Sequence, residues 1–168
     1  ITTELQTNGD ARWTVSTTYN LSDTNETEAY RDLAEDFESG ADPREFVESS
    51  RSILGIASFE RAAASVNQHT DREMAITDRQ RTTASPEEVA NGTGRLTLEF
   101  TWTNFARTDG NSLILDDVLV TSSGNPWLQR LSDSQSLTII APDEYGVRDS
   151  ADGVSPEEGR LHWEGPEE

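Results

Sequence analysis

The sequence predicts a single α+β domain, with a mostly antiparallel β-sheet, an N-terminal bulged hairpin and two helices packed on one face of the sheet. Apolar and polar residues alternate over the first 21 residues and in several segments after residue 73, as in half-buried strands. Between residues 25 and 66 the apolar residues follow a helical period instead. The 168 residues are enough for one domain with its own core, and no repeat or linker divides them. We therefore expect one domain over residues 1–168, with a short disordered tail at about 165–168.

The first expected element is a hairpin whose turn contains an Asn-Gly pair. A two-residue turn would place Leu5 opposite Arg12 and mix apolar with polar positions on each face. A three-residue loop ending at Gly9 pairs Thr3 with Trp13 instead and keeps the apolar residues together. It also puts Gly9 at the left-handed position of a bulged turn, which glycine adopts at little cost. We therefore expect the bulged hairpin.

Two helices are expected next. Asn25 can cap the first, because Glu28 follows three residues later as in a capping box, and Gly40 can end it. An Asp-Pro pair followed by Arg-Glu favours a second helix over about 42–66. That helix contains Gly55, which costs about 1 kcal/mol relative to Ala in a helix interior. A close approach of the helix to the sheet, or a kink, would explain the glycine.

The second half of the chain is expected to be mostly strands. In the stretch LTLEFTWT, which starts at Leu96, the apolar residues occupy alternate positions and belong to the inside of a sheet. A turn follows Phe105, where the alternation ends. The tryptophans at 13, 102 and 163 lie among apolar strand positions and are expected in the core, whereas Trp127 is expected at the edge of the core in a loop, with sugar stacking as the less favoured alternative. Strands are expected at about 73–83, 96–103, 137–141 and 161–163, and a short strand with a turn at 113–120.

The charge of the chain indicates its environment. There are 32 acidic residues and 13 basic ones, a net charge of -19, and every basic residue is arginine. Such a charge repels itself at ordinary ionic strength, but at about 1 M salt the Debye length is only ~3 Å and the repulsion is largely screened. We interpret the composition as adaptation to molar salt; an acidic protein of an ordinary cell is the alternative. The lack of a basic patch argues against nucleic-acid binding by this segment.

The sequence predicts neither catalysis nor a cofactor or metal site. Cysteine is absent, which removes thiolate catalysis and cysteine-ligated metals. Of the two histidines, His69 is expected at a helix end, and His162 is expected to face solvent. Acidic pairs such as Asp116 and Asp117, or the acidic residues of 149–152, are expected to be solvated surface, because carboxylates are common everywhere in the chain. A hydrolase that uses two carboxylates across a cleft is the least favoured hypothesis.

Three Asn-x-Ser/Thr sequons, at Asn20, Asn25 and Asn91, are possible N-glycosylation sites. Each lies next to residues that favour turns, and together they favour an exported protein. The sequence contains no run of apolar residues long enough to cross a membrane and no signal peptide. Because it begins with Ile rather than Met, we expect a mature form or an excised segment.

Several blocks of the sequence, in this order, carry a resemblance to a known group of proteins. The blocks are NGDARWTV (8–15), the acidic helical region, FTWTNF (100–105) with Asp109-Gly110, LTIIAPDEY (137–145) and LHWEGP (161–166). The sequence resembles the extracytoplasmic domain of uncharacterised haloarchaeal membrane proteins. In that group the domain follows a signal peptide and precedes one transmembrane helix, often joined to a cytoplasmic winged helix-turn-helix domain. The resemblance supplies no catalytic or binding residues.

Together these observations favour a non-enzymatic sensory or interaction domain on the extracytoplasmic face of a halophile's membrane. Its partner is expected to be an unknown protein or small-molecule ligand. Its only link to the membrane is expected to be a C-terminal helix that is missing from this segment. A structural or adhesion module of the cell surface is the alternative hypothesis. A sensor needs two states of the domain that a ligand binds unequally.

Overall fold

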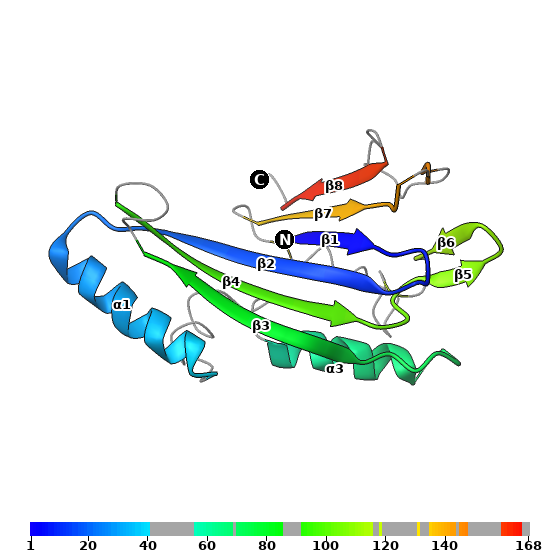
Figure 1. Ribbon diagram of the computed structural model, residues 1–168, viewed down its shortest axis with the longest axis horizontal. Helices are drawn as coiled ribbons and strands as arrows, with labels where there is room; N and C mark the ends of the chain where they lie inside the picture. Colours follow the sequence, from blue (N-terminus) through cyan, green and yellow to red (C-terminus); the bar gives the residue numbers. More distant parts are fainter. Residues whose placement is uncertain are drawn as a thin grey trace.

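In the part of the chain that it describes, the computed structural model has two helices and two sheets, in the order shown in Figure 1. The structure describes residues 1–40, 56–68, 70–85, 92–115, 118, 131, 135–143, 145–147 and 159–165. The larger sheet has six strands and is antiparallel except for one parallel pair, β1 with β7. The expected α+β class is therefore confirmed.

The six-stranded sheet contains the longest strands at one side and the shortest at the other (Figure 1). Its order is β3 (Ile76–Ala84), β4 (Thr93–Trp102), β2 (Ala11–Asn20), β1 (Thr2–Leu5), β7 (Ser136–Ile140) and β8 (Arg160–Glu164). A separate small hairpin joins β5 (Arg107–Asp109) to β6 (Ser112–Ile114). The order brings the N-terminal hairpin to the middle of the sheet, between segments far apart in the sequence.

The N-terminal hairpin has the register that the sequence predicts. Thr3 lies opposite Trp13 and Leu5 opposite Ala11. The peptide N–H of Gly9 donates to the Gln6 carbonyl at 3.0 Å, and Gly9 has a φ of 92°. A side chain at Gly9 would also meet the carbonyl oxygen of Ala106 at 2.5 Å. Glycine is thus required there both by the left-handed backbone and by the close approach of another segment.

One face of the six-stranded sheet, the inner face, carries the core. Along β2 and β4 buried residues alternate with more exposed ones, as the period of a strand requires. Trp13 and Phe100 stack with ring centroids 6.0 Å apart, and Phe105 meets the Trp13 ring edge-on at 5.4 Å. The buried strand residues of this face are Thr3, Leu5, Ala11, Trp13, Val15, Ile76, Leu96, Leu98, Phe100, Trp102, Leu137 and Ile139.

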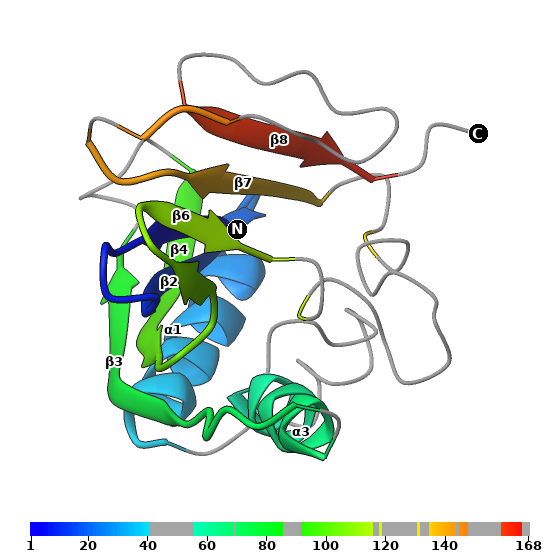
Figure 2. The same cartoon turned by 90° about the vertical axis from the view of Figure 1, so that its right-hand side faces the viewer.

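Both helices cover the inner face, so the expected arrangement of helices is confirmed (Figure 2). The first helix is α1 (Thr24–Glu38), which buries Tyr30 and Phe37. The guanidinium of Arg81, on β3, lies 5.5 Å from the centroid of the Phe37 ring. The second helix is described as α3 (Ile56–Asn67), and its Phe59 ring lies 4.7 Å from that of Phe100. The expected start of this helix at residue 42 lies outside the described residues.

The N-cap of α1 differs from the prediction. Asp23, not Asn25, precedes the helix with an extended backbone, and its carboxylate accepts the peptide N–H of Glu26 at 2.9 Å. The Glu26 carboxylate accepts the N–H of Ser22 at 2.5 Å. Asp23 and Asn25 can both cap a helix, but the hydrogen bonds of Glu26 with Asp23 and Ser22 favour Asp23 as the N-cap. Asn25 lies in the first turn instead.

A tyrosine of α1 packs against two neighbouring strands, β3 and β4. The Tyr30 hydroxyl lies 2.7 Å from the Ala84 carbonyl and 2.9 Å from the Arg95 carbonyl. Its ring occupies the space over Gly94, which belongs to β4, so this strand begins earlier than the expected residue 96. Half-buried Tyr19 lies beside Tyr30. The pKa of Tyr19 is raised to about 12, mainly because the hydroxyl is removed from water and to a smaller extent because Tyr30 is close to it.

Other boundaries shift by a few residues. The strand expected from residue 73 begins at Ile76, although Met74 before it is buried. Trp163, expected in the core, is only half-buried at the edge of the sheet. Gly165, expected in a disordered tail, is buried, and its N–H donates to the Gln135 carbonyl at 2.8 Å. The expected core-edge position of Trp127 lies outside the described residues.

Candidate functional site

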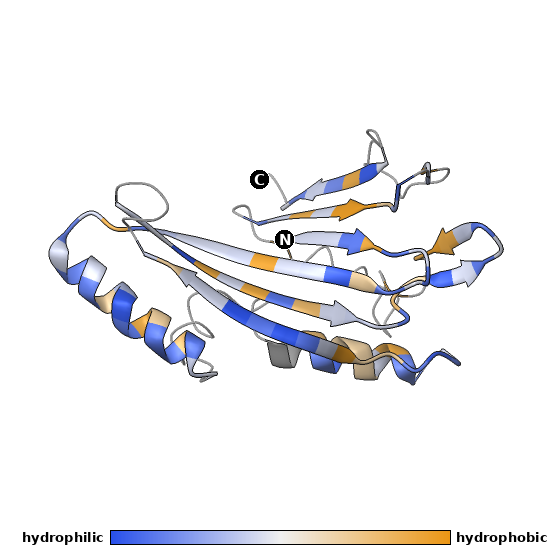
Figure 3. Ribbon diagram, in the orientation of Figure 1, coloured by the Kyte–Doolittle hydropathy of each residue, from blue (hydrophilic) through white to orange (hydrophobic). Residues whose placement is uncertain are grey.

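The second face of the six-stranded sheet, which we call the outer face, has no helix over it among the described residues (Figure 2). The strand registers assign its side chains, and half of them are Ser or Thr. Polar positions alternate with apolar ones along β2 and β4 in Figure 3. The outer face consists of Thr2, Glu4, Arg12, Thr14, Ser16, Thr18, Asn20, Thr77, Gln80, Thr82, Ala84, Thr93, Arg95, Thr97, Glu99, Thr101, Ser136, Thr138, Ile140, Arg160, His162 and Glu164.

The outer face is balanced in charge, although the whole chain is strongly acidic. The residues that the strand registers assign to it include three arginines and three glutamates, whose formal charges cancel, whereas the chain has -19. One further carboxylate, that of Asp78 in the bulge of β3, lies beside the Thr77 hydroxyl at the border of this face. By contrast α1, on the opposite side, carries six acidic residues and one arginine within 15 residues. Among the described residues, α1 therefore carries a marked excess of acid on the side away from the outer face. This balance can be found in the sequence by reading only the polar positions of the alternating segments, and sequence reasoning missed it.

Cross-strand contacts hold the middle of the outer face. The Ser16 and Thr97 hydroxyls lie 3.1 Å apart. Arg12 lies 3.4 Å from the Glu99 carboxylate, and both side chains are partly exposed. Cross-strand pairs of these kinds contribute roughly 0.2–1 kcal/mol each. They fix the positions of hydroxyl, guanidinium and carboxylate groups on a surface that solvent reaches.

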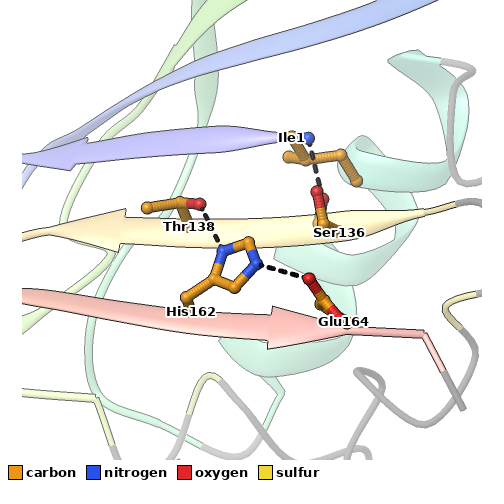
Figure 4. Close-up of polar contacts among 5 residues, drawn as sticks. All are labelled: Ile1, Ser136, Thr138, His162 and Glu164. Carbon is orange, nitrogen blue, oxygen red and sulfur yellow. Dashed lines mark hydrogen bonds and ion pairs between the residues drawn. The ribbon is translucent and has the colours of Figure 1, made fainter. Parts of the chain in front are cut away.

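A small polar cluster lies on the outer face where β7 meets β8 (Figure 4). Thr138 lies opposite His162 in the register, and its hydroxyl is 2.8 Å from the imidazole Nδ1. The other ring nitrogen lies 3.5 Å from the Glu164 carboxylate. Nearby, the amino group of Ile1 donates to the Ser136 carbonyl at 2.8 Å. His162 faces outward as expected, but both of its ring nitrogens have neighbours that orient it.

The cluster has the hydroxyl–imidazole–carboxylate order that proton transfer uses. The histidine side chain is 49% exposed and that of Glu164 72% exposed, so water reaches both groups. The contacts follow directly from the antiparallel register, which places a threonine opposite a histidine. We therefore interpret the cluster as a contact that helps to pair β8 with β7 and as part of the polar surface of the outer face.

The described part of the chain contains two of the three predicted glycosylation sites. Asn20 is exposed at the end of β2 and lies opposite Thr93, the hydroxyl residue of the third sequon. Asn25 is exposed in the first turn of α1. Asn91 lies outside the described residues. Glycosylation at all three positions stays a prediction, with solvent access established at the first two.

The other residues considered from the sequence are not brought together. His69, Asp116, Asp117 and the acidic residues of 149–152 lie outside the described residues. Among the residues that are described, no group of three His, Asp or Glu side chains could hold a metal ion. Neither of the helices described is long and apolar enough to cross a membrane.

Comparison with protein families matches residues 2–145 to a domain of unknown function, DUF7345. The chain belongs to the DUF7345 family. The matched range of the DUF7345 domain takes in both helices, the small hairpin and five of the six strands of the sheet, and ends before β8. No curated protein and no solved structure matches the chain.

Proposed function

We propose that this DUF7345 domain is a non-enzymatic binding domain that takes a protein or small-molecule ligand on the outer face of its sheet. The observation that carries the proposal is the charge balance of that face in a chain of charge -19. Centres of binding surfaces are depleted in charged residues, because removing an unpaired charge from water is costly. The charges of the outer face are balanced in sign, and Arg12 lies close enough to Glu99 to pair with it, so a ligand there would cover fewer unpaired charges than on the acidic helix α1. The hydroxyl groups of the outer face can donate and accept hydrogen bonds.

We further propose that the domain is exported and works at the membrane surface of a halophile, as a sensory or interaction module. The acidic, lysine-free composition and the exposed sequon asparagines Asn20 and Asn25 support this. So does the resemblance to extracytoplasmic domains of haloarchaeal membrane proteins. A structural or adhesion module of the cell surface is the alternative, in which the outer face packs against a neighbour without transmitting a signal.

A ligand screen in molar salt tests the binding proposal. Free amino acids, short oligosaccharides and short peptides would be added to the purified domain at about 2 M KCl, where surface charges are screened. A compound that binds the folded state raises the melting temperature, by an amount that grows with its concentration. The variant Ser16→Glu places an unpaired acid in the middle of the outer face, and we expect it to weaken that binding roughly tenfold or more.

The matched control is Thr24→Glu, which adds the same charge at the exposed start of α1. We expect it to leave binding unchanged. Binding that survives Ser16→Glu and is lost with Thr24→Glu would put the ligand on the helical side and contradict the proposal. A screen in which no compound raises the melting temperature favours the structural alternative.

The reading frame on both sides of residues 1–168 tests the proposed location. A signal peptide upstream and about 20 apolar residues after Glu168 would support a membrane-anchored exported domain. A further basic helix-turn-helix segment would support sensing with a DNA-binding output. A frame that has neither an export signal nor an apolar segment would exclude the membrane location and leave only the binding proposal.

A further inference from the structure

Strand β8 forms one border of the six-stranded sheet among the described residues (Figure 1). The Gly165 N–H donates to the Gln135 carbonyl, and the Ala141 N–H donates to the Gly159 carbonyl, both at 2.8 Å. Antiparallel pairing alternates between residues that exchange hydrogen bonds and residues that do not. The peptide groups of the odd-numbered residues of β8 therefore point to β7. Those of Arg160, His162 and Glu164 point to the open side.

The sequence of β8 complements itself when read in opposite directions. When two β8 strands pair antiparallel with His162 at the centre, Arg160 of one copy lies opposite Glu164 of the other. By symmetry, Glu164 of the first copy lies opposite Arg160 of the second. Leu161 lies opposite Trp163 on the inner face, where both side chains are half-buried. Opposite charges and apolar pairs across strands are favourable. In this register the residues whose peptide groups point away from β7, Arg160, His162 and Glu164, lie opposite one another in the two copies. Each of the three residue pairs can exchange two backbone hydrogen bonds, about six in all.

We propose that the domain forms a two-fold symmetric dimer by pairing β8 with β8 of a second copy, centred on His162. Such an interface presents the same patch from both subunits, as two-fold symmetry requires. The two sheets then become one continuous sheet, and the two outer faces form a single surface. This inference rests on the edge and the sequence of β8, and does not depend on what the outer face binds.

The opposite border of the sheet is not built for such pairing. Strand β3 has a register shift between Thr77 and Gln80, and Asp78 within it has a φ of 52°. A bulge of this kind twists an edge strand and interrupts its row of peptide groups, which disfavours pairing with another chain. The contrast between the two edges singles out β8. A second copy also fits better than an unrelated strand, because a copy supplies the matching charges by itself.

The overall charge sets the conditions for a test. Two domains of charge -19 repel each other at low ionic strength, and salt of about 2 M screens that repulsion. Sedimentation equilibrium at about 2 M KCl would measure the dimer dissociation constant of the wild type and of three variants: Arg160→Glu, Glu164→Arg and the double exchange. Each single variant turns two attractive pairs into repulsive ones. We expect each to raise the Kd roughly tenfold or more, and the double exchange to restore it.

Arg95→Glu is the control for the first variant, because it makes the same change of net charge on β4, inside the sheet. We expect its Kd to equal that of the wild type. Circular dichroism melting of every variant would show that the fold is retained. A wild type that stays monomeric up to about 1 mM protein would overturn the proposal. So would a double exchange that folds but fails to recover the dimer lost in the single variants.

Discussion

At Gly94 the ring of Tyr30 fills the space that a side chain would occupy. A Cβ atom built on Gly94 would lie 2.4 Å from the ring, which is closer than carbon atoms approach in a packed core. The ring and its hydroxyl also hold α1 against β3 and β4, through the carbonyls of Ala84 and Arg95. One missing side chain thus decides how the first helix meets the sheet.

We therefore expect Gly94→Ala to destabilise the domain by about 1–3 kcal/mol, because the added methyl group displaces Tyr30 from its site. Chemical denaturation followed by tryptophan fluorescence would measure the loss. Gly146→Ala is the matched control, since a Cβ at Gly146 has nothing within 4 Å. Equal stability of the two variants would show that Tyr30 does not occupy this position.

Sequence reasoning could identify the buried residues of the strands but not this contact. The alternation of Leu96, Leu98, Phe100 and Trp102 predicted their burial, and each is at most 2% exposed. Gly94 gave only a local indication of a loop, because glycine is common in turns. Its partner Tyr30 lies on a helix 64 residues earlier, and no local pattern connects the two positions.

At the scale of the elements, the start of α1 depends on a choice between two nearby residues. Both Asp23 and Asn25 are good N-caps, and each is followed three residues later by a glutamate. The structure gives the cap to Asp23, whose carboxylate accepts the Glu26 N–H. We expect Asp23→Ala to cost about 1 kcal/mol of stability, within the range found for N-cap removal.

Asn25→Ala tests the same assignment from the other side. Asn25 is exposed in the first turn, where alanine is the better helix former, so we expect no loss of stability. Thermal melting of the two variants under the same salt conditions would compare them. The original prediction, with Asn25 as the cap, would be restored if the larger loss occurred at Asn25.

The order of the strands shows which part of the topology a sequence reveals. The hairpin of β1 and β2 followed from the positions of Gly9, Thr3 and Trp13, which are close in the sequence. The parallel pairing of β1 with β7 did not, because Thr2 and Thr138 meet across most of the chain. Short strands carry too few side chains to specify such a neighbour by pattern. The edge formed by β8 therefore became visible only in the structure.

At the scale of the whole molecule, the distribution of charge separates two surfaces. The exposed side of α1 carries Glu28, Asp32 and Glu35 in one row, and the outer face carries equal numbers of arginines and glutamates. Like charges four residues apart on a helix destabilise it, and a net charge of -19 opposes the compact state as a whole. Salt screens both effects, so the stability of the domain should depend on ionic strength.

We expect the melting temperature to fall by roughly 10 °C or more when KCl is lowered from about 2 M to about 0.05 M, which corresponds to a loss of several kcal/mol. Differential scanning calorimetry in both buffers would measure it. The triple variant Glu28→Gln, Asp32→Asn, Glu35→Gln should show a smaller fall, because it removes repulsion within α1. Glu99→Gln, which removes a carboxylate paired with Arg12, should not. A wild-type melting temperature that is the same at both salt concentrations would contradict adaptation to molar salt, and the acidic surface would then need another explanation.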